Sequence, residues 1–534
     1  MNEDCLWWKQ GVFYQIYPRS FMDSNADGVG DLQGIMDKLD YLVDLGVDAI
    51  WISPIYPSPM ADFGYDVSDY TGIDPIFGDM ETFDRLLGEA HQRGLRIVLD
   101  YVPNHSSVEH PWFIESESSL NNPKRDWYIW KDPKADCSPP NNWEAVVAGS
   151  AWNWDEATGQ YYLAQFIKDE PDLNWRNPEV VSAMIDVLKF WLDKGVDGFR
   201  MDMLPHLFEH PDFPDNPVLP DDHPFKAIGQ NLEQVYTVDQ PETHAVVRKF
   251  RKLFDSYDGE RVIIGETPLF DMGQLASYYG ENLDEVHIPF NFKLLMTSWD
   301  APQMKSVLEE YYAAIPDGAV PSIVFGNHDF SRIATKFGPK NQRSAAVLLL
   351  TLWGVPTMYY GDEIGMEDIN VPPDRLQDPW AFIEGGNARD PERTPMQWDA
   401  SANAGFSPPG IETWLPVGEN YPHVNVANQL DDPASTLHFY KNLLKLRRER
   451  PSLHQGDFEF IEGVPEEVLA YIRQAGDERT LVLVNFQDTA YELDLSHIGA
   501  SAELLLSTHF PPGDNLCLSK LVLTPHESQI LHLK

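Results

Sequence analysis

Apolar residues recur along the first two thirds of the chain in short runs and in helical stripes. Short apolar runs between polar boundaries are typical of buried strands, and eight of them lie at 12–17, 49–53, 96–101, 196–201, 261–265, 285–290, 322–325 and 356–360. Apolar residues three or four apart predict helices between several runs. Three such stripes are Leu32, Ile35, Leu39 and Leu42; Phe83, Leu86, Leu87 and Ala90; and Val180, Met184, Val187, Leu188 and Trp191. Gly46, Gly94 and Gly195 follow these stripes, where a left-handed helix cap favours glycine.

Eight strands that alternate with helices predict an α/β fold, a closed parallel (β/α)8 TIM barrel. The competing fold, a doubly wound open sheet, is expected to carry a glycine-rich phosphate turn after an early strand. The sequence has no such turn there. We therefore predict the barrel, with its active site at the carboxyl ends of the strands.

The spacing of the predicted strands indicates three parts of the chain. About a hundred residues separate the third strand from the fourth, so residues 104–174, rich in Trp, Pro, Asn and Tyr, are predicted to form an inserted irregular domain. The barrel then comprises residues 1–103 and 175–453, with long loops at 205–241 and 362–423. Alternating runs at 458–461, 468–472, 481–485, 502–506 and 529–533 predict a C-terminal antiparallel β-sandwich over 454–534.

Composition excludes several classes of protein. With 43% hydrophobic and 12% aromatic residues, the chain has enough apolar material for large cores. Its 84 acidic and 39 basic residues give a net charge of −45. So negative a chain is not expected to bind nucleic acid or an anionic membrane, and it suits a neutral substrate.

Cysteine usage and the absence of long apolar runs predict a compartment. The three cysteines, Cys5, Cys137 and Cys517, are far apart and odd in number, which predicts a reducing environment and no disulfide framework. The acidic first residues lack the apolar segment of a secretory signal, and no run of eighteen apolar residues occurs. We expect a cytoplasmic monomer or homodimer without a membrane partner.

Charged residues cluster at the ends of the predicted strands. Arg200 and Asp202 stand two residues apart, so their side chains share one face of the fourth strand. An arginine there keeps a carboxylate ionised and oriented, as a nucleophile needs, although a structural ion pair is the alternative interpretation. The third strand ends in 100–105 (DYVPNH), the fifth in Glu266, and 327–329 (NHD) follow the seventh. Carboxyl groups at one barrel mouth suit glycosidic bond cleavage, in which one attacks C1 and another protonates the leaving oxygen.

These segments resemble known motifs. Residues 100–105, 198–202 (GFRMD), Glu266 and 327–329 resemble the four signature regions of the α-amylase superfamily, glycoside hydrolase family 13. Residues 170–175 (EPDLNW) resemble a fifth region in the QPDLN form of its α-glucosidase and oligo-1,6-glucosidase branch. Residues 62–70 (DFGYDVSDY) and 389–398 (RDPERTPMQW) resemble further segments of that branch. The matches run from about residue 12 to residue 398.

The resemblance implies a role for each matched residue. Asp202 would be the nucleophile, Glu266 the general acid/base and Asp329 a third acid that binds sugar hydroxyls. Arg200 would orient Asp202. The remaining implied contacts to the terminal glucose are hydroxyl binding by His105 and His328, aromatic stacking by Phe166 and Phe292, and closure of the pocket by Asp62 paired with Arg393 beside Tyr65.

Three positions depart from the pattern of the branch. Val147 stands where relatives carry a Phe that lines the pocket, and Glu170 replaces a Gln at the edge of the +1 side. Met203 follows the nucleophile, where in relatives Val accompanies α-1,6 preference and Thr or Ala accompanies α-1,4 preference. We hypothesise that Met203 and Glu170 reshape the acceptor side toward short or non-standard acceptors.

Oxygen donors alternate near the N-terminus in a pattern typical of a calcium loop. Asp23, Asn25, Asp27, Val29 and Asp31 surround a turn glycine, which matches the front half of such a loop. A solvated acidic turn is the alternative, because no bidentate Glu stands at position twelve. The resemblance favours a structural divalent cation, Ca²⁺ or Mg²⁺, since the branch binds one here. No organic cofactor is expected.

The sequence therefore predicts an exo-acting, retaining α-glucosidase that removes a terminal non-reducing α-linked glucose from short oligosaccharides or α-glucosides, with transglucosylation. A transglucosylase or a sucrose/trehalose isomerase shares every catalytic residue and is the alternative within the family. A non-catalytic amylase-like partner protein is the alternative of another class. The heavy chains of certain transporters are proteins of this kind; they normally carry a membrane span, and some lack catalytic acids. This chain has all three acids.

Overall fold

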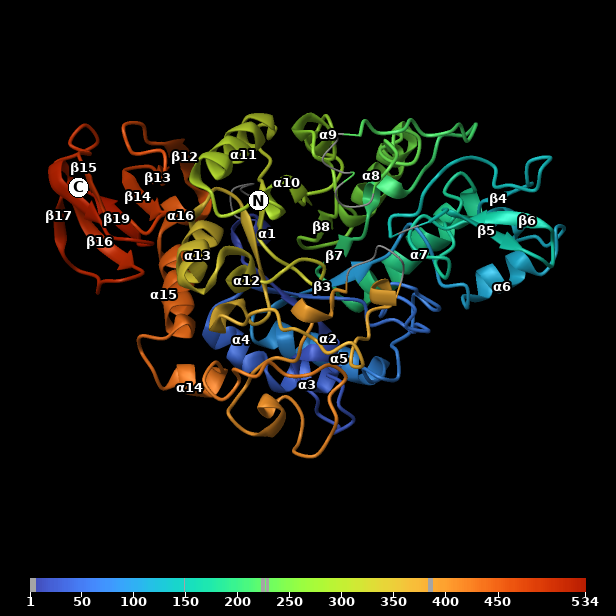
Figure 1. The fold of residues 1–534 in the computed structure, drawn as a ribbon, viewed down its shortest axis with the longest axis horizontal. Coiled ribbons are helices and arrows are strands. Elements are labelled where there is room, and N and C mark those ends of the chain that lie inside the picture. Colours follow the sequence, from blue (N-terminus) through green and yellow to red (C-terminus); the bar gives the residue numbers. More distant parts are fainter. Residues whose placement is uncertain (1–5, 148, 222–225, 227–229, 383–387) are drawn as a thin grey trace.

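The computed structural model describes residues 6–147, 149–221, 226, 230–382 and 388–534. At its centre is a sheet of eight parallel strands in the order β10-β11-β1-β2-β3-β7-β8-β9 (Figure 1). The strands are β1 (Phe13–Ile16), β2 (Ala49–Ile52), β3 (Arg96–Tyr101), β7 (Gly198–Met201), β8 (Val262–Gly265), β9 (Ile288–Pro289), β10 (Ser322–Val324) and β11 (Val355–Tyr359). Each overlaps one predicted apolar run, which confirms the predicted barrel.

The barrel has a seam between β9 and β10. Among the described residues no backbone ladder joins these two strands, and Pro289 in β9 has no N–H to donate to one. Ser322 in β10 bridges the gap instead: its hydroxyl donates to the Pro289 carbonyl over 2.9 Å and accepts from the Asn291 N–H over 3.1 Å. A side chain therefore closes the ring.

Helices flank the strands and begin and end at recognisable caps. The Asn177 side chain caps the start of α7, and Gly195 ends α7 with a φ of 104°. The stripe at 32–42 forms two helices instead of one, because Lys38 leaves helical geometry between α3 and α4. The helices around the barrel are α1 (Trp7–Gln10), α2 (Pro18–Phe21), α3 (Leu32–Asp37), α4 (Leu39–Leu45), α5 (Met80–Gln92), α7 (Pro178–Lys194), α8 (Pro241–Phe254), α9 (Met272–Ser277), α10 (Phe292–Leu295), α11 (Ala301–Ala314), α12 (Ile333–Phe337), α13 (Gln342–Thr351) and α14 (Val426–Leu430).

The chain between β3 and α7 contains α6 (Pro111–Glu117) and a separate antiparallel sheet of order β4-β6-β5. The sheet strands are β4 (Trp130–Lys131), β5 (Trp152–Asp155) and β6 (Gln160–Leu163). Trp143 and Trp152 pack together in a small apolar cluster of their own. The segment then returns to the barrel mouth, where His105 and Asp172 form a β-bridge and Ser106 N donates to the Pro171 carbonyl.

After α15 (Thr436–Glu449) and α16 (Pro451–Gln455) the chain forms an antiparallel sheet of order β12-β13-β14-β19-β16-β17. Its strands are β12 (Asp457–Phe460), β13 (Val468–Ala475), β14 (Glu478–Asn485), β16 (Ser501–Ser507), β17 (Asn515–Cys517) and β19 (Ser528–Leu533). A second layer pairs β15 (Tyr491–Leu493) with β18 (Leu521–Leu523). The residues of β13 alternate, with Leu469 and Tyr471 in the barrel core and Ala470 and Ile472 in the sandwich core.

Arg473 fastens this sheet to the barrel. Its buried guanidinium group donates to the Thr351 carbonyl at the end of α13 over 2.7 Å and to the Gly456 carbonyl over 2.8 Å. Burial lowers the pKa of Arg473 to about 10. The contact therefore depends on backbone carbonyls in place of a carboxylate partner.

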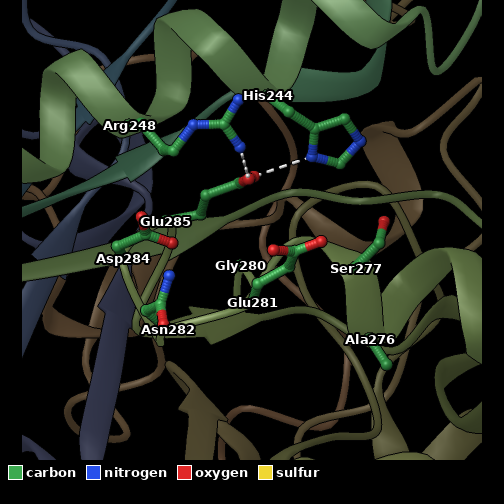
Figure 2. Close-up of a pocket in the computed structure, with 9 residues that line it drawn as sticks. All are labelled: His244, Arg248, Ala276, Ser277, Gly280, Glu281, Asn282, Asp284 and Glu285. Atoms are coloured by element: carbon green, nitrogen blue, oxygen red, sulfur yellow. Dashed lines mark hydrogen bonds and ion pairs between the residues drawn. The ribbon is translucent and has the colours of Figure 1, made fainter.

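An open hollow of about 710 Å³ lies on the outer side of the barrel, between α8, α9 and the segment that leads into β9 (Figure 2). Glu285 pairs there with His244 over 2.7 Å and with Arg248 over 2.6 Å. None of the predicted site residues lines this hollow. In the part of the chain that the structure describes, no helix is both long and apolar enough to cross a membrane.

Candidate active site

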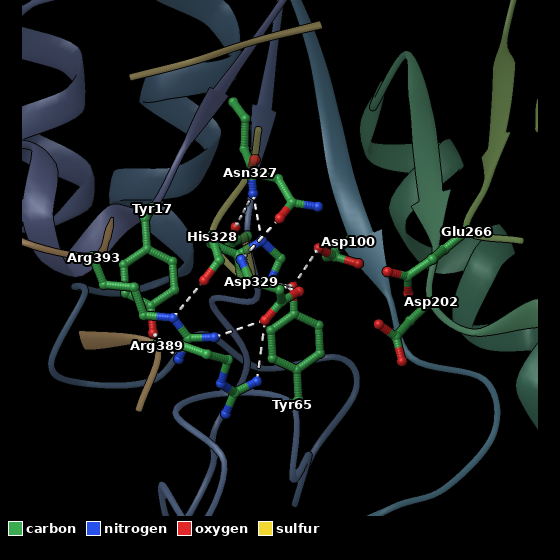
Figure 3. Close-up of polar contacts among 12 residues, drawn as sticks. Tyr17, Tyr65, Asp100, Asp202, Glu266, Asn327, His328, Asp329, Arg389 and Arg393 are labelled. Atoms are coloured by element: carbon green, nitrogen blue, oxygen red, sulfur yellow. Dashed lines mark hydrogen bonds and ion pairs between the residues drawn. The ribbon is translucent and has the colours of Figure 1, made fainter. Parts of the chain in front are cut away.

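Four carboxyl groups gather at the carboxyl ends of the barrel strands (Figure 3). Asp100 lies in β3, Asp202 and Glu266 directly follow β7 and β8, and Asp329 follows β10. The sheet ladder continues past β7, because Asp202 N donates to the Tyr101 carbonyl over 2.8 Å. The three predicted catalytic acids therefore lie together at the mouth of the barrel.

Arg200 binds three of these acids at once. Its side chain is 1% exposed. Nη1 lies 2.8 Å from Asp100 Oδ1 and 2.7 Å from Asp202 Oδ1, and Nη2 lies 2.6 Å from Glu266 Oε2. Burial raises the pKa of Asp202 well above its ordinary value, Arg200 lowers it, and the charges of Glu266 and Asp100 raise it further. One buried guanidinium group thus holds three carboxyl groups together.

Met203 contacts the acid/base candidate through its backbone. Its N–H donates to Glu266 Oε2 over 3.0 Å. Its φ of 40° lies in the left-handed region, which is unfavourable for a residue with a side chain. The turn after the nucleophile candidate is therefore strained and also holds Glu266.

A chain of hydrogen bonds sets the tautomer of His328. The Gln15 amide Nε2 lies 2.8 Å from His328 Nδ1 and can only donate, so Nε2 carries the hydrogen. That nitrogen lies 2.6 Å from the Tyr65 hydroxyl, which donates to Asp100 Oδ2 over 3.1 Å. The Tyr65 and His328 rings stack with their centroids 5.3 Å apart. Burial lowers the pKa of His328, so the ring is neutral at neutral pH.

Asp329 lies among cations and is partly exposed. Its side chain is 23% exposed. Arg389 Nη1 and Arg393 Nη2 donate to Asp329 Oδ1 over 3.1 and 2.9 Å, and His328 Nε2 lies 3.2 Å from Oδ2. Burial alone would raise the pKa of Asp329, but the positive charges of Arg389, Arg393 and Arg200 hold it below its usual range. Asp329 is therefore a stable carboxylate.

The predicted pairing of Asp62 with Arg393 is wrong. Asp62 pairs with Arg389 instead. Arg393 is occupied elsewhere, because its Nε donates to the His328 carbonyl over 2.7 Å. The buried Asp378 holds Arg389 from the other side, with Oδ2 2.9 Å from Nε. The sequence reasoning missed Arg389 and Asp378 as site residues, although Arg389 lies in the matched segment 389–398.

His105 and Phe166 lie together at the edge of the mouth, with ring centroids 5.1 Å apart. Glu170 lies close to them, with Oε1 3.4 Å from His105 Nε2. Its side chain is 0% exposed. The inserted segment folds back and buries Glu170 beside His105, and its predicted place at the edge of the +1 side stays a prediction.

Phe292 and Val147 take part in none of these contacts. Phe292 begins α10 and packs edge-on against Phe330, with ring centroids 5.8 Å apart. Val147 is half-buried in the segment before β5. Among the described residues, no hydrogen bond, ion pair or ring contact joins either residue to the four acids.

Hydrogen bonds from its own side chains to its backbone hold the loop at 23–31 in shape. Asp23 is 2% exposed and accepts the Gly28 N–H over 2.9 Å, while Asp31 caps α3 by accepting the Gly34 N–H over 2.7 Å. Within the described ranges, no three His, Cys, Asp or Glu side chains are grouped as metal ligands. The loop nevertheless offers only oxygen donors, which suits a hard divalent cation, and each carboxylate keeps lone pairs beyond those in use. By donor chemistry, Asp23, Asn25, Asp27, Val29 and Asp31 fit Ca²⁺ or Mg²⁺, and the cation stays a prediction.

Two family models match almost the whole chain. The model described as "Alpha amylase, catalytic domain" matches residues 15–456, and the one described as "Maltogenic Amylase, C-terminal domain" matches residues 458–530. Together they cover the barrel and the C-terminal sheet.

Individual relatives match along their full length. Maltase A1 of Drosophila melanogaster is 38% identical, covering 98% of this chain and 96% of that protein. The oligo-1,6-glucosidase of Heyndrickxia coagulans is 39% identical, covering 99% of each. Among solved structures, the α-glucosyl transfer enzyme XgtA has a TM-score of 0.91 at 37% identity, covering 99% of this chain and 100% of that one. The trehalulose synthase MutB from Pseudomonas mesoacidophila has a TM-score of 0.91 at 36% identity, covering 99% of each chain.

Proposed function

This chain belongs to the α-amylase family, a family of glycoside hydrolases, and from that premise we propose that it is an exo-acting, retaining α-glucosidase. Its substrate would be a short oligosaccharide or α-glucoside with a terminal non-reducing α-linked glucose. One observation carries the proposal: a single guanidinium group, that of Arg200, contacts both Asp202 and Glu266. A nucleophile and an acid held this close suit double displacement, in which both act on one glycosidic bond.

In the first step, an Asp202 oxygen attacks C1 of the glucose while the bond from C1 to the leaving oxygen breaks. Glu266 gives its proton to that oxygen, and a covalent glucosyl ester on Asp202 remains. In the second step, the Glu266 carboxylate takes a proton from water, the water oxygen attacks C1, and Asp202 leaves as a carboxylate. A sugar hydroxyl in place of water gives transglucosylation.

The contacts of Glu266 favour one position for its proton. Arg200 Nη2 and Met203 N both approach Oε2 of Glu266, at 2.6 and 3.0 Å. Donors that face one oxygen stabilise negative charge on it, so the proton is held on Oε1. Arg200 also keeps Asp202 available as a carboxylate, against the burial that raises its pKa.

Closure of the pocket supports exo action. Arg389 joins Asp62, from the loop after β2, to Asp329, from the loop after β10. A wall of ion pairs on this side would block a continuing chain and so favour a terminal sugar. Asp329, Arg393 and His328 would then bind hydroxyl groups of that sugar.

The test is Asp202→Asn, which removes the nucleophilic oxygen and keeps the shape of the side chain. We expect turnover of p-nitrophenyl α-glucoside to fall by several orders of magnitude, with an unchanged circular dichroism spectrum. Substantial residual activity in the folded variant refutes the assignment of the nucleophile.

A transglucosylase or sucrose isomerase is the second candidate, and it is favoured by the similarity to XgtA, an α-glucosyl transfer enzyme, and to MutB, a trehalulose synthase. Both candidates share the acids and differ in whether water or a sugar hydroxyl accepts the glucosyl group. Product analysis at high sucrose or maltose concentration separates them. Free glucose as the main product supports hydrolysis, and larger or rearranged saccharides support transfer.

We also propose a structural cation and a cellular setting. Asp23, Asn25, Asp27, Val29 and Asp31 would hold Ca²⁺ or Mg²⁺, which would tie the loop after β1 together without taking part in catalysis. The protein would act on small saccharides in the cytoplasm as a monomer or homodimer. The charge of −45 supports the absence of nucleic acid and membrane partners.

A further inference from the structure

Both ring nitrogens of His105 face hydrogen-bond acceptors. Nδ1 lies 3.0 Å from Asn104 Oδ1. The orientation of that amide is fixed, because Asn104 Nδ2 donates to the His206 carbonyl over 2.6 Å, so Nδ1 must carry a hydrogen. Nε2 lies 3.4 Å from Glu170 Oε1. A neutral imidazole has one N–H only, so a neutral His105 has no hydrogen to offer Glu170.

Glu170 has no other side-chain partner. Its side chain is fully buried, and among the described residues neither carboxyl oxygen makes a hydrogen bond of good geometry, although the Ile167 backbone approaches it. The fold holds it there, because the neighbouring Pro171 carbonyl accepts the Ser106 N–H and Asp172 forms a β-bridge with His105. A buried carboxylate without a partner is costly, so it takes up a proton or acquires a cationic neighbour.

We propose that Glu170 and His105 share one proton at neutral pH, which makes Glu170 a positioning residue for His105. The proton lies on Oε1 and points to Nε2, or it lies on Nε2 and points to Oε1. In both forms it joins two groups that otherwise present lone pairs to each other. The inference depends on the proposed function only for the role of His105 at the terminal sugar.

The surrounding charges determine when the shared proton is lost. The charged groups that face the pair are Asp62, Asp66, Asp172 and Arg389. Burial raises the pKa of Glu170, the charges of Asp62 and Asp66 raise it further, and Arg389 lowers it. Burial lowers the pKa of His105 to about 4, against the nearby acids and the Tyr65 carbonyl, which raise it. The proton therefore belongs mainly to Glu170.

The sign of the pH effect follows from the raised pKa of Glu170. Its pKa in the folded protein lies above the value in the unfolded chain, so its stabilising contribution is complete below the ordinary Glu range. That contribution is lost as the pH rises through the raised value. Above it, a buried negative charge faces both Asp62 and the lone pair of His105 Nε2. His105 then loses its fixed position beside the sugar.

Glu170→Gln tests the proposal, because an amide has the same shape and supplies an N–H that does not titrate. KM and kcat for p-nitrophenyl α-glucoside would be measured from about pH 5 to about pH 10. We expect the wild-type KM to rise at the alkaline end by about fivefold or more relative to that of Glu170→Gln. The pH dependence of kcat should be the same in both proteins, because neither Asp202 nor Glu266 is changed. The melting temperature should fall at alkaline pH in the wild type and change less in the variant.

Glu209→Gln is the matched control. Glu209 is another buried glutamate whose pKa burial raises, but its ionic partner is Arg176. We expect this variant to change the melting temperature profile and to leave the pH dependence of KM as in the wild type. If Glu170→Gln keeps the wild-type pH dependence of both KM and melting temperature, the shared proton is refuted. An inactive wild type would instead refute the proposed function. The pH dependence of the melting temperatures would still show whether Glu170 and His105 share a proton.

Discussion

Arg200→Lys measures how much of the site depends on one guanidinium group. Arg200 reaches Asp100, Asp202 and Glu266 at 2.6–2.8 Å through two nitrogens. A lysine keeps the charge, but its single nitrogen cannot face acids on both sides in this way. At least one charge-assisted hydrogen bond is then lost, which is worth about 1.5–3 kcal/mol. Because the transition state loses this stabilisation, kcat/KM should fall roughly 10- to 150-fold.

The same variant should change the pH profile. Burial raises the pKa of Asp202 and Arg200 lowers it. Lysine is a weaker partner, so the pKa of Asp202 should be higher in the variant than in the wild type. Attack on C1 needs the carboxylate form of Asp202. The acid limb of kcat/KM should therefore move to higher pH, and the loss of activity should be largest at low pH.

The assay is kcat/KM for p-nitrophenyl α-glucoside from about pH 4 to about pH 9. Arg85→Lys is the control, because Arg85 is exposed on α5 and contacts Gln33, away from the acids. Circular dichroism would show that both variants fold. If Arg200→Lys stays within about threefold of the wild type at every pH, the reasoning from Arg200 is refuted.

Three further changes test other parts of the molecule. Met203→Thr should alter the relative hydrolysis rates of maltose, isomaltose and sucrose, because residue 203 adjoins the nucleophile and contacts Glu266; unchanged ratios contradict its role in acceptor preference. Arg473→Met should lower the free energy of unfolding in urea by about 3 kcal/mol or more, because buried carbonyls lose their donor. The exposed Arg448→Met is the control, and an equally large effect of that variant would contradict this prediction. A chelator should lower the melting temperature of the wild type but not of Asp27→Ala, and a wild type indifferent to chelation argues against the cation.

The barrel and the gathering of the acids follow from the sequence. Parallel strands all end at one mouth, so an acid directly after a strand is fixed in space as well as in sequence. Asp202 and Glu266 meet for this reason, although they are far apart along the chain. Short elements such as β15 and β18 do not follow, because three residues are too few for an alternating pattern.

Two features of the site depend on contacts that the sequence does not specify. Arg389 and Arg393 lie four residues apart and both have the length to reach Asp62. The choice falls to Arg389 because Asp378 holds it in place, while Arg393 binds the His328 carbonyl. The burial of Glu170 depends on how the inserted segment folds back onto the barrel, which local patterns of polar and apolar residues do not describe.

The eight strands surround a common core, but their backbone pairing is not continuous: it begins at β10 and ends at β9, and among the described residues these two strands do not pair with each other. β8, which delivers Glu266, lies near one end, and β10, which leads to Asp329, forms the other. Parting the ends breaks no described β-ladder, only side-chain contacts such as the two hydrogen bonds of the Ser322 hydroxyl and the bridge that Lys336 Nζ makes between the Leu295 and Phe325 carbonyls. Amide hydrogen exchange should therefore be faster in β9 and β10 than in β2 and β3. The predicted general acid, Glu266, and the predicted sugar-binding acid, Asp329, lie on opposite sides of this seam, which side chains hold together in place of a backbone ladder.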